Sequence, residues 1–436
     1  MNAIKAPATK IYNFPHWRCY LNMNKYLICS LFSLWALSVS ALQPYSATTN
    51  SPKTIADPPV VQFGTKGKLH SKILDEDRPY MVCLPPSYRS EGKAKYPVLY
   101  ILDGEAHFEW ASSMVRFLSA GPGFNQQIPE MIVVAIPNTG NNRVRDLTPT
   151  HAPRDIEGKE NMKLSPSGGG RAFEKFLVDE LIPQIESEYR TAPFRVFAGH
   201  SLGGLLAIDI FLQRPGLFQG CIAMDPAFYW DDERLLRDTQ EIFENKKPLP
   251  GSLYISSANN FTPGAAMGEA MRRTCRNFTE LLRTNAPGGL RTKSGYYESD
   301  DHSSVTFPTL YHGLLFVFDD YRVRLTEALE NPTILTSHFK RASARFGYEM
   351  LPPEGFVNWI GYYQLREKDN LEKAIEYFKL NVSNYPASAN SWDSLAEGWM
   401  RKGESKLAIQ NYEKALALSP NLRTARDALK KLQASK

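Results

Sequence analysis

Short apolar runs alternate with longer amphipathic stretches over residues 80–320 of this 436-residue chain. We interpret the apolar runs as buried strands; they cover residues 80–84, 96–102, 131–136, 196–198, 221–224, 253–257 and 293–297. Stretches with helical spacing of apolar residues stand between them, at 110–118, 171–189, from 202 onward and at 309–318. Strands that alternate with helices predict an α/β fold, with a mostly parallel sheet covered by helices on both faces. Ligands of such sheets bind at the carboxyl ends of the strands.

The C-terminal part has a different pattern, which repeats at a period of 34 residues. At this shift Ala374 matches Ala408, Phe378 matches Tyr412 and Pro386 matches Pro420. Further positions of the same unit are filled by Trp392, Gly403 and Ala415. This series is typical of tetratricopeptide repeats, in which small residues let paired helices pack closely and proline ends each unit. Two units rarely stand alone, so we expect them to dock on the preceding domain, with residues 422–432 as a capping helix.

The N-terminal segment resembles a secretory signal peptide. After Met23 come the basic Lys25, an apolar run over 26–39 and the small-residue cleavage site Val39-Ser40-Ala41. The pattern suits a start at Met23, and it predicts a periplasmic or secreted protein. A membrane anchor is the alternative, but the run is short for a span, so no stable membrane span is expected after cleavage.

These patterns divide the chain into five segments. We predict a leader at 1–41, a flexible lead-in at 42–61 and an α/β catalytic domain at 62–321. A helical linker at 322–353 and the all-helical repeats at 354–436 complete the chain.

Charge and cysteine content exclude several classes of protein. The formal charge of +5 falls to +1 without residues 1–41, which hold four basic residues and no acidic one. A nearly neutral chain argues against nucleic acid as a partner. Cys83, Cys221 and Cys275 remain after the leader; they form no disulfide framework, and no ligand spacing for a metal is present. We expect neither a metal nor another cofactor.

The sequence Gly199-His200-Ser201-Leu202-Gly203 stands between a predicted strand and a predicted helix. This G-x-S-x-G spacing is typical of a nucleophile elbow, a sharp turn that exposes the serine at the top of the sheet. Ser201 is therefore the candidate nucleophile, and His200 is expected to point away from it. The backbone N–H of Leu202 would form one half of an oxyanion hole.

His302 is the candidate general base. In folds with such an elbow the triad residues follow the chain order Ser, acid, His, which requires the histidine after the final strand. His302 lies on a polar loop after the last predicted strand. Gly104, after the strand 96–102, is expected to offer the second N–H of the oxyanion hole. The nearby His107, Phe108 and Trp110 are candidates for binding substrate, although packing alone explains buried aromatic residues equally well.

The motifs VLYILDGEAHF, AGHSLGG, MDPAFYW and YYESDDHSSV are similar to those of the putative esterase family over residues 62–321. That family includes esterase D, feruloyl and acetyl esterases, and siderophore-ester hydrolases of the enterochelin esterase type. The resemblance implies an α/β-hydrolase fold and serine ester hydrolysis, with Ser201 as nucleophile and His302 as base. It also suggests a siderophore or another bulky ester as substrate.

The acid of the triad departs from that pattern. It usually follows the strand at 253–257, where this chain has Ala258-Asn259-Asn260. Glu269 is the nearest carboxylate downstream and the favoured candidate. Asp225 and Asp301 are alternatives, and a dyad without a carboxylate is a further one.

The sequence thus predicts a periplasmic or secreted serine esterase that acts on a small-molecule ester through an acyl-enzyme. The competing hypothesis is a non-catalytic interaction protein, in which the hydrolase domain is a docking body and the helical repeats bind a protein partner.

Overall fold

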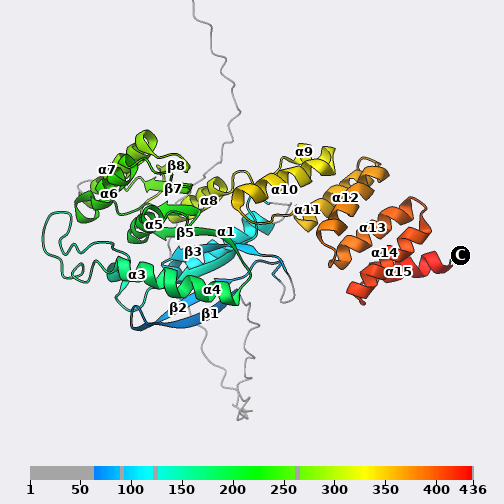
Figure 1. Ribbon diagram of the computed structural model, residues 1–436, viewed down its shortest axis with the longest axis horizontal. Helices are drawn as coiled ribbons and strands as arrows, with labels where there is room; N and C mark the ends of the chain where they lie inside the picture. Colours follow the sequence, from blue (N-terminus) through cyan, green and yellow to red (C-terminus); the bar gives the residue numbers. More distant parts are fainter. Residues whose placement is uncertain (1–62, 89–92, 121–125, 261–265, 435–436) are drawn as a thin grey trace, which may run out of the picture. The chain divides into compact units, whose positions relative to one another are not determined.

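A computed structural model describes residues 63–88, 93–120, 126–260 and 266–434 (Figure 1). The predicted signal peptide and the lead-in up to residue 61 therefore lie outside the described residues. Among the helices of the described ranges, none combines the length and the apolar character that crossing a membrane requires.

Eight strands form one sheet in the order β1-β2-β4-β3-β5-β6-β7-β8. Their bounds are β1 Thr65–Ser71, β2 Glu76–Cys83, β3 Tyr96–Leu102, β4 Ile132–Ile136, β5 Thr191–His200, β6 Gly220–Met224, β7 Gly251–Ala258 and β8 Leu290–Tyr297. The six strands β3 to β8 run parallel to one another. At the edge of the sheet, β1 pairs antiparallel with β2, and β2 pairs antiparallel with β4. Every strand predicted from an apolar run is present. The strand β1 was not predicted, because its sequence (TKGKLHS) is polar. Most of its side chains are exposed or half-buried at the sheet edge.

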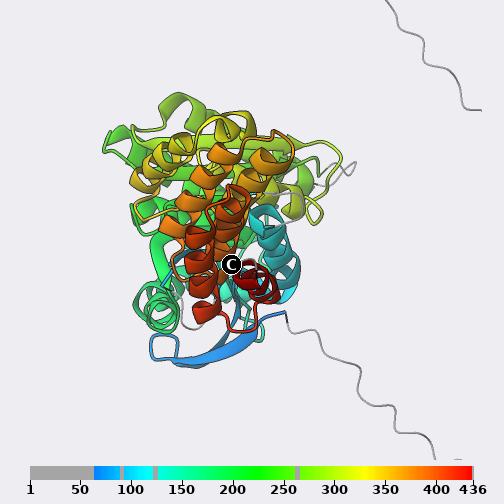
Figure 2. The same cartoon turned by 90° about the vertical axis from the view of Figure 1, so that its right-hand side faces the viewer.

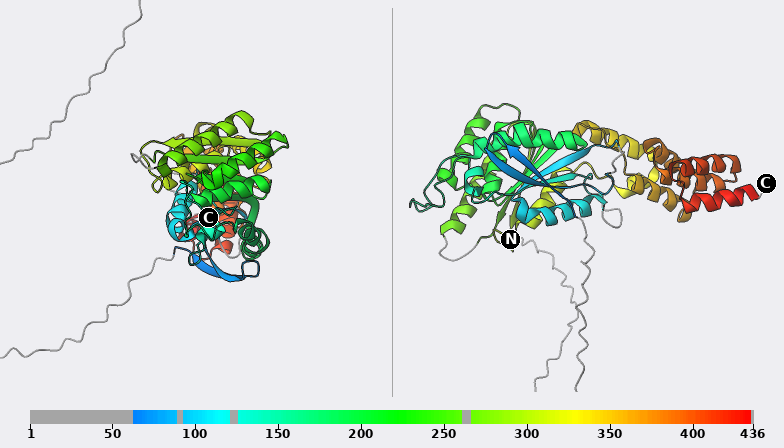
Figure 3. Two further views of the ribbon diagram at one scale, coloured as in Figure 1. Left: turned by 90° about the vertical axis from the view of Figure 1, so that its left-hand side faces the viewer. Right: turned by 90° about the horizontal axis from the view of Figure 1, so that it is seen from below.

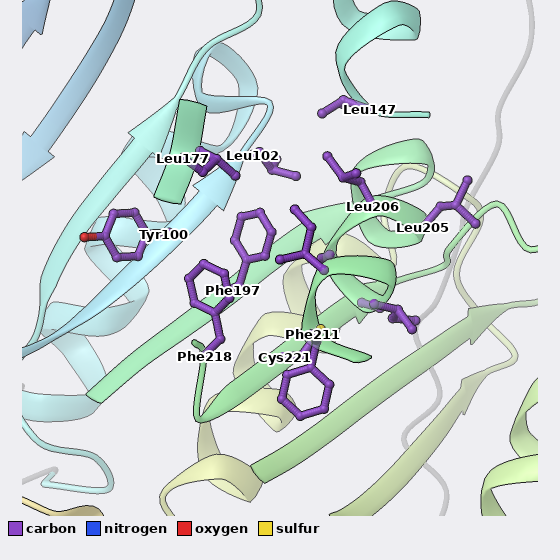
Figure 4. Packing of buried hydrophobic residues seen from close by; sticks show 14 of the residues in the cluster. Tyr100, Leu102, Leu147, Leu177, Phe197, Leu205, Leu206, Phe211, Phe218 and Cys221 are labelled. Atoms are coloured by element: carbon purple, nitrogen blue, oxygen red, sulfur yellow. The ribbon is translucent and has the colours of Figure 1, made fainter. Parts of the chain in front are cut away.

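Helices cover both faces of this sheet, as the fold class predicted (Figure 3). They are α1 Gly104–Ala120, α2 Arg143–Asp146, α3 Gly170–Phe176, α4 Ile182–Glu188, α5 Leu202–Gln213, α6 Trp230–Glu244, α7 Ala266–Asn285 and α8 Thr306–Val317, with one π-helical turn, η1 Leu177–Leu181, between α3 and α4. The α1 and α8 helices pack on one face, and α3 to α7 pack on the other. Alternation along β5 serves both layers: Phe197 packs with α5 and Phe218 (Figure 4), while Val196 and Ala198 face α1 and α8. A strand that is buried on both faces has a continuous apolar sequence, which is why this strand could be predicted.

The C-terminal helices pair as the 34-residue period predicts (Figure 2). After α9 Leu325–Glu330 and α10 Pro332–Phe346 come α11 Glu354–Arg366, α12 Leu371–Asn384, α13 Ala389–Arg401, α14 Ser405–Leu418 and α15 Arg423–Ala434. Ala374 and Ala408, one period apart, are both fully buried between helices. The first pair packs on the preceding segment, since Tyr377 donates a hydrogen bond to the carbonyl of Ala328 at 2.6 Å. The domain boundaries and the tetratricopeptide assignment stay predictions.

A buried acid on α5 gives the fold a pH-dependent stability. Asp209 is 2% exposed, and burial raises its pKa to about 6 although Arg171 lies 3.0 Å away. A carboxyl whose pKa is higher in the folded state binds its proton more tightly there, so its contribution to stability falls as pH rises from about 4 through about 6. Asp209→Asn should therefore stabilise the protein by about 1–2 kcal/mol at about pH 8 and have less effect at about pH 5.

Urea unfolding of both proteins at the two pH values measures this difference. Asp427→Asn, a change of an exposed carboxylate on α15, is the control and should alter the free energy of unfolding by less than about 0.5 kcal/mol at both pH values. A destabilised Asp209→Asn protein at the higher pH would mean that the pair with Arg171 outweighs the burial cost.

Candidate active site

Residues with positive φ gather where neighbouring parallel strands end. Asp103 (φ 53°), Ser201 (58°), Asp225 (43°) and Asn260 (48°) follow β3, β5, β6 and β7. These strands are neighbours in the sheet, so the strained residues share one edge of it. Strain of this kind costs free energy and is characteristic of functional sites.

Ser201 occupies the sharp turn between β5 and α5, with φ 58° and ψ −118°. Its N–H donates to the carbonyl of Met224 at 3.0 Å, and its carbonyl accepts from Ala227 at 3.1 Å, which ties the turn to the end of β6. A Cβ on Gly199 would lie 2.2 Å from the carbonyl oxygen of Gly203. Glycine at position 199 is thus a steric requirement of the elbow.

His302 lies on the loop between β8 and α8, where a base was expected. Its Nδ1 is 2.7 Å from Oδ2 of Asp225, which follows Met224 at the end of β6 and is fully buried. A carboxylate accepts only, so Nδ1 carries the proton and Nε2 is the basic nitrogen. Ser201 and His302 are therefore both linked to the same strand end.

The carboxylate that contacts His302 is Asp225 and not Glu269. Glu269 is exposed in the first turn of α7, and the hydrogen bond to His302 comes from β6 instead. Asp301 has another role, because its carboxylate accepts from the backbone N–H groups of Ser303 and Ser304 and so shapes the loop. These hydrogen bonds also lower the pKa of Asp301. Of the three carboxylates considered from the sequence, the structure thus brings Asp225 to His302.

Leu202 and Gly104 are each the first residue of a helix, α5 and α1. Their N–H groups have no acceptor within the helix and are available to an oxyanion. The two turns adjoin, since a Cβ on Gly203 would lie 3.4 Å from Oδ2 of Asp103. Gly104 is needed for close packing: a Cβ there would lie 2.8 Å from the backbone nitrogens of Ile136 and Pro137.

Arg143, on α2, was missed by the sequence analysis. Its Nε and Nη2 donate to the two carboxylate oxygens of Asp103 at 2.6 and 3.0 Å, and Nη2 lies 3.4 Å from the carbonyl of His200. Burial opposes the charge of Asp103, but Arg143 outweighs it and keeps the pKa of that carboxyl below its ordinary value. Arg143 thus brings a positive charge from α2, in the segment between β4 and α3, to the elbow.

His200 does not point away from the site, which corrects the expectation from the motif. Its Nε2 donates to the carbonyl of His302 at 2.7 Å, and the centroids of the two imidazole rings are 4.4 Å apart. Burial, reinforced by repulsion from His302 when that imidazole is protonated, lowers the pKa of His200 to about 4. His200 is therefore a neutral side chain near pH 7 and supports the loop that carries the base.

The three candidates for substrate binding lie in different environments. His107 is buried, with Nδ1 2.9 Å from the carbonyl of Leu102, and Phe108 belongs to the core. Trp110 is half-buried and packs 5.7 Å from the exposed ring of Phe307, just after the His302 loop. Only Trp110 of these three combines an aromatic surface with access from solvent. Among the described residues, no group of three His, Cys, Asp or Glu side chains is arranged to hold a metal ion.

Comparison with known proteins agrees with this geometry. Residues 71–251 match the family described as "Putative esterase". A solved IroE-like serine hydrolase from Shewanella oneidensis is 31% identical, with a TM-score of 0.64, over 73% of this chain and 98% of that one. Ferri-bacillibactin esterase BesA of Bacillus subtilis is 27% identical over 252 residues, which are 56% of this chain and 85% of BesA. The siderophore triacetylfusarinine C esterase of Aspergillus fumigatus is 26% identical over 289 residues, 57% of this chain and 91% of that protein.

The parallel sheet and the serine elbow define an α/β-hydrolase with the features of a serine hydrolase. The chain belongs to the putative esterase family, and it is an esterase. For the C-terminal helices, a 76-residue match, 17% of this chain, is 36% identical to a quarter (25%) of the chloroplastic tetratricopeptide repeat protein PYG7 of Arabidopsis thaliana.

Proposed function

We propose that this esterase cleaves carboxylic esters through an acyl-enzyme, with Ser201 as nucleophile, His302 as general base and Asp225 as the orienting acid. The observation that carries the proposal is the 2.7 Å contact between His302 Nδ1 and the buried Asp225, which leaves Nε2 as the proton acceptor beside the elbow. The non-catalytic alternative is set aside because the chain is an esterase.

The reaction follows from the position of each group. Ser201 Oγ attacks the ester carbonyl while its proton passes to His302 Nε2, and Asp225 stabilises the imidazolium. The N–H groups of Leu202 and Gly104 stabilise the negative oxygen of the tetrahedral intermediate. The alcohol then leaves with the proton from His302. Water then attacks the acyl carbon and gives a proton to His302. His302 returns this proton to Ser201 Oγ as the carboxylic acid leaves, which regenerates the enzyme.

Hydrolysis of p-nitrophenyl esters from acetate to octanoate by the purified protein tests this mechanism. We expect turnover of at least one ester of the series, and covalent labelling of Ser201 by a fluorophosphonate. Absence of both turnover and labelling would contradict the proposal.

The substrate we propose is a bulky siderophore ester. The support comes from relatives named for siderophore esters and from the Trp110–Phe307 pair beside the His302 loop. Contacts far from the scissile bond lower the barrier for a large substrate, so we expect kcat/KM for ferri-bacillibactin to exceed that for p-nitrophenyl acetate about 100-fold.

Trp110→Ala should reduce this preference by raising KM for the large ester and leaving hydrolysis of the small one unchanged. Phe117→Ala, a change of an exposed aromatic residue on the same helix, is the control. Equal kcat/KM for both esters in the unaltered protein would rule out the siderophore assignment.

We also propose that residues 1–41 export the protein to the periplasm or the medium, as the n-region, apolar run and cleavage site indicate. Fractionation of cells, with sequencing of the mature N-terminus, tests this. A mature protein that begins at Leu42 supports the proposal, and an uncleaved cytosolic protein contradicts it.

A further inference from the structure

The position after β7 that usually holds the acid of this fold holds Asn260, and Asn260 contacts the acid. Its Nδ2 donates to Asp225 Oδ2 at 2.7 Å, the same oxygen that accepts from His302 Nδ1 at 2.7 Å. The other oxygen, Oδ1, accepts from the N–H of Ala258 at 3.0 Å. Three donors thus surround a carboxylate that has no access to water.

Asn260 is itself held firmly. Its backbone is left-handed (φ 48°), a conformation that asparagine tolerates better than most residues. The Nη1 of Arg272 donates to the carbonyls of Asn259 and Asn260 at 2.9 and 2.8 Å. Gly268 lets α7 approach, since a Cβ there would lie 2.2 Å from the carbonyl oxygen of Asn260. The first turns of α7 therefore fix the backbone of Asn260, from which the side-chain amide reaches Asp225.

We propose that Asn260 is a positioning residue: with Arg272 and Gly268 it fixes the rotamer and the charge of Asp225, and through Asp225 the orientation of His302. This inference rests on the proposed triad and extends it. A buried carboxylate is stable as an anion only when donors satisfy its oxygens. Without the Asn260 amide, Oδ2 keeps a single donor, the imidazole that it has to orient.

The arrangement also explains why β6 and β7 do not both end in a carboxylate. A carboxyl group at residue 260 would lie at hydrogen-bond distance from Asp225, and two such groups share one proton until the pH rises. Once both carboxyl groups are ionised, a further negative charge lies near His302, so the imidazolium form of His302 loses its proton at a higher pH. Asn260→Asp should therefore move the acidic limb of the kcat/KM profile to higher pH.

Steady-state hydrolysis of p-nitrophenyl acetate by Asn260→Ala tests the inference. We expect kcat to fall about 10- to 100-fold with little change in KM, the effect of losing one hydrogen bond to a charged group. Asn259→Ala is the matched control: its side chain donates to the carbonyl of Glu298 and not to Asp225, so kcat should stay within about twofold of the parent. Thermal unfolding of each variant separates a local effect from a loss of fold.

Proton NMR of the His302 Nδ1–H supplies a readout that does not need turnover. The resonance, assigned by its loss in His302→Ala, should shift in Asn260→Ala and stay in place in Asn259→Ala. Unchanged kcat and an unchanged resonance in Asn260→Ala would overturn the positioning role. If the parent protein had no esterase turnover but the resonance still shifted in Asn260→Ala, the proposed mechanism would be refuted and the positioning role would stand.

Discussion

Ser201→Ala should lower kcat for every ester about 10,000-fold or more, and it should abolish fluorophosphonate labelling. The substitution removes the only oxygen that the proposed mechanism acylates, and it leaves the backbone bonds of the elbow to Met224 and Ala227 in place. Substrate binding should therefore persist, so that the loss appears in kcat and not in KM. Ser303→Ala, a serine exposed on the His302 loop, should behave like the parent.

The same position separates activity from stability. Ser201 holds a positive φ that glycine adopts without strain. Ser201→Gly should be as inactive as Ser201→Ala and yet more stable than it by about 1 kcal/mol, measured by urea unfolding. An active Ser201→Ala protein would show that another group is the nucleophile, and equal stability of the two variants would show that the turn is unstrained.

The parts of the site that sequence alone predicted depend on local rules. Ser201 could be predicted because the strand, the G-x-S-x-G spacing and the helix are contiguous in the sequence, and because the turn needs glycine at position 199 for steric reasons. His302 followed from the order of the chain, since one polar loop with a histidine came after the last strand. The strands of the sheet could be predicted equally well, because strands that are buried on both faces are apolar throughout.

The carboxylate that contacts His302 could not be predicted in the same way. The contact between Asp225 and His302 joins residues 77 positions apart, and it depends on how β6 and the loop after β8 are placed at the sheet edge. Glu269 was favoured for its proximity in sequence to the usual position, but α7 carries it to the surface. One available signal was the position of Asp225 directly after a fully apolar strand, where a buried carboxylate needs a partner.

Arg143 and His200 show a second limit. Arg143 stands in a long polar loop whose path no periodicity reveals, and only the bidentate pair with Asp103 places it at the elbow. His200 occupies a variable position of the motif, and its direction depends on the carbonyl of His302, which is 102 residues away. Both residues reach the site through tertiary contacts, which a local pattern does not encode.

Asp225→Asn is expected to lower kcat about 1,000- to 10,000-fold with a small effect on KM. Two donors, from Asn260 and His302, converge on Oδ2, and a third, from Ala258, meets Oδ1. A carboxylate accepts from all three, whereas an amide has one oxygen and one NH2 group. In either orientation of the amide, its NH2 therefore faces a donor. Where the NH2 faces His302, the imidazole is driven toward the tautomer that no longer presents a basic Nε2; where it faces the N–H of Ala258, His302 keeps its tautomer but the neutral amide gives the imidazolium no counter-charge.

The control distinguishes the two carboxylates that were in competition. Glu269→Gln changes an exposed group on α7 and should leave kcat within about twofold of the parent. Asp225→Asn should also lower the free energy of unfolding by about 1–3 kcal/mol, because a buried donor is left without an acceptor. If Glu269→Gln lost activity and Asp225→Asn kept it, the acid would have to reach His302 from α7, and the 2.7 Å contact at the end of β6 would be structural only. Because the same experiment reports kcat and unfolding for both variants, a catalytic role of Asp225 is separated from a role in packing alone.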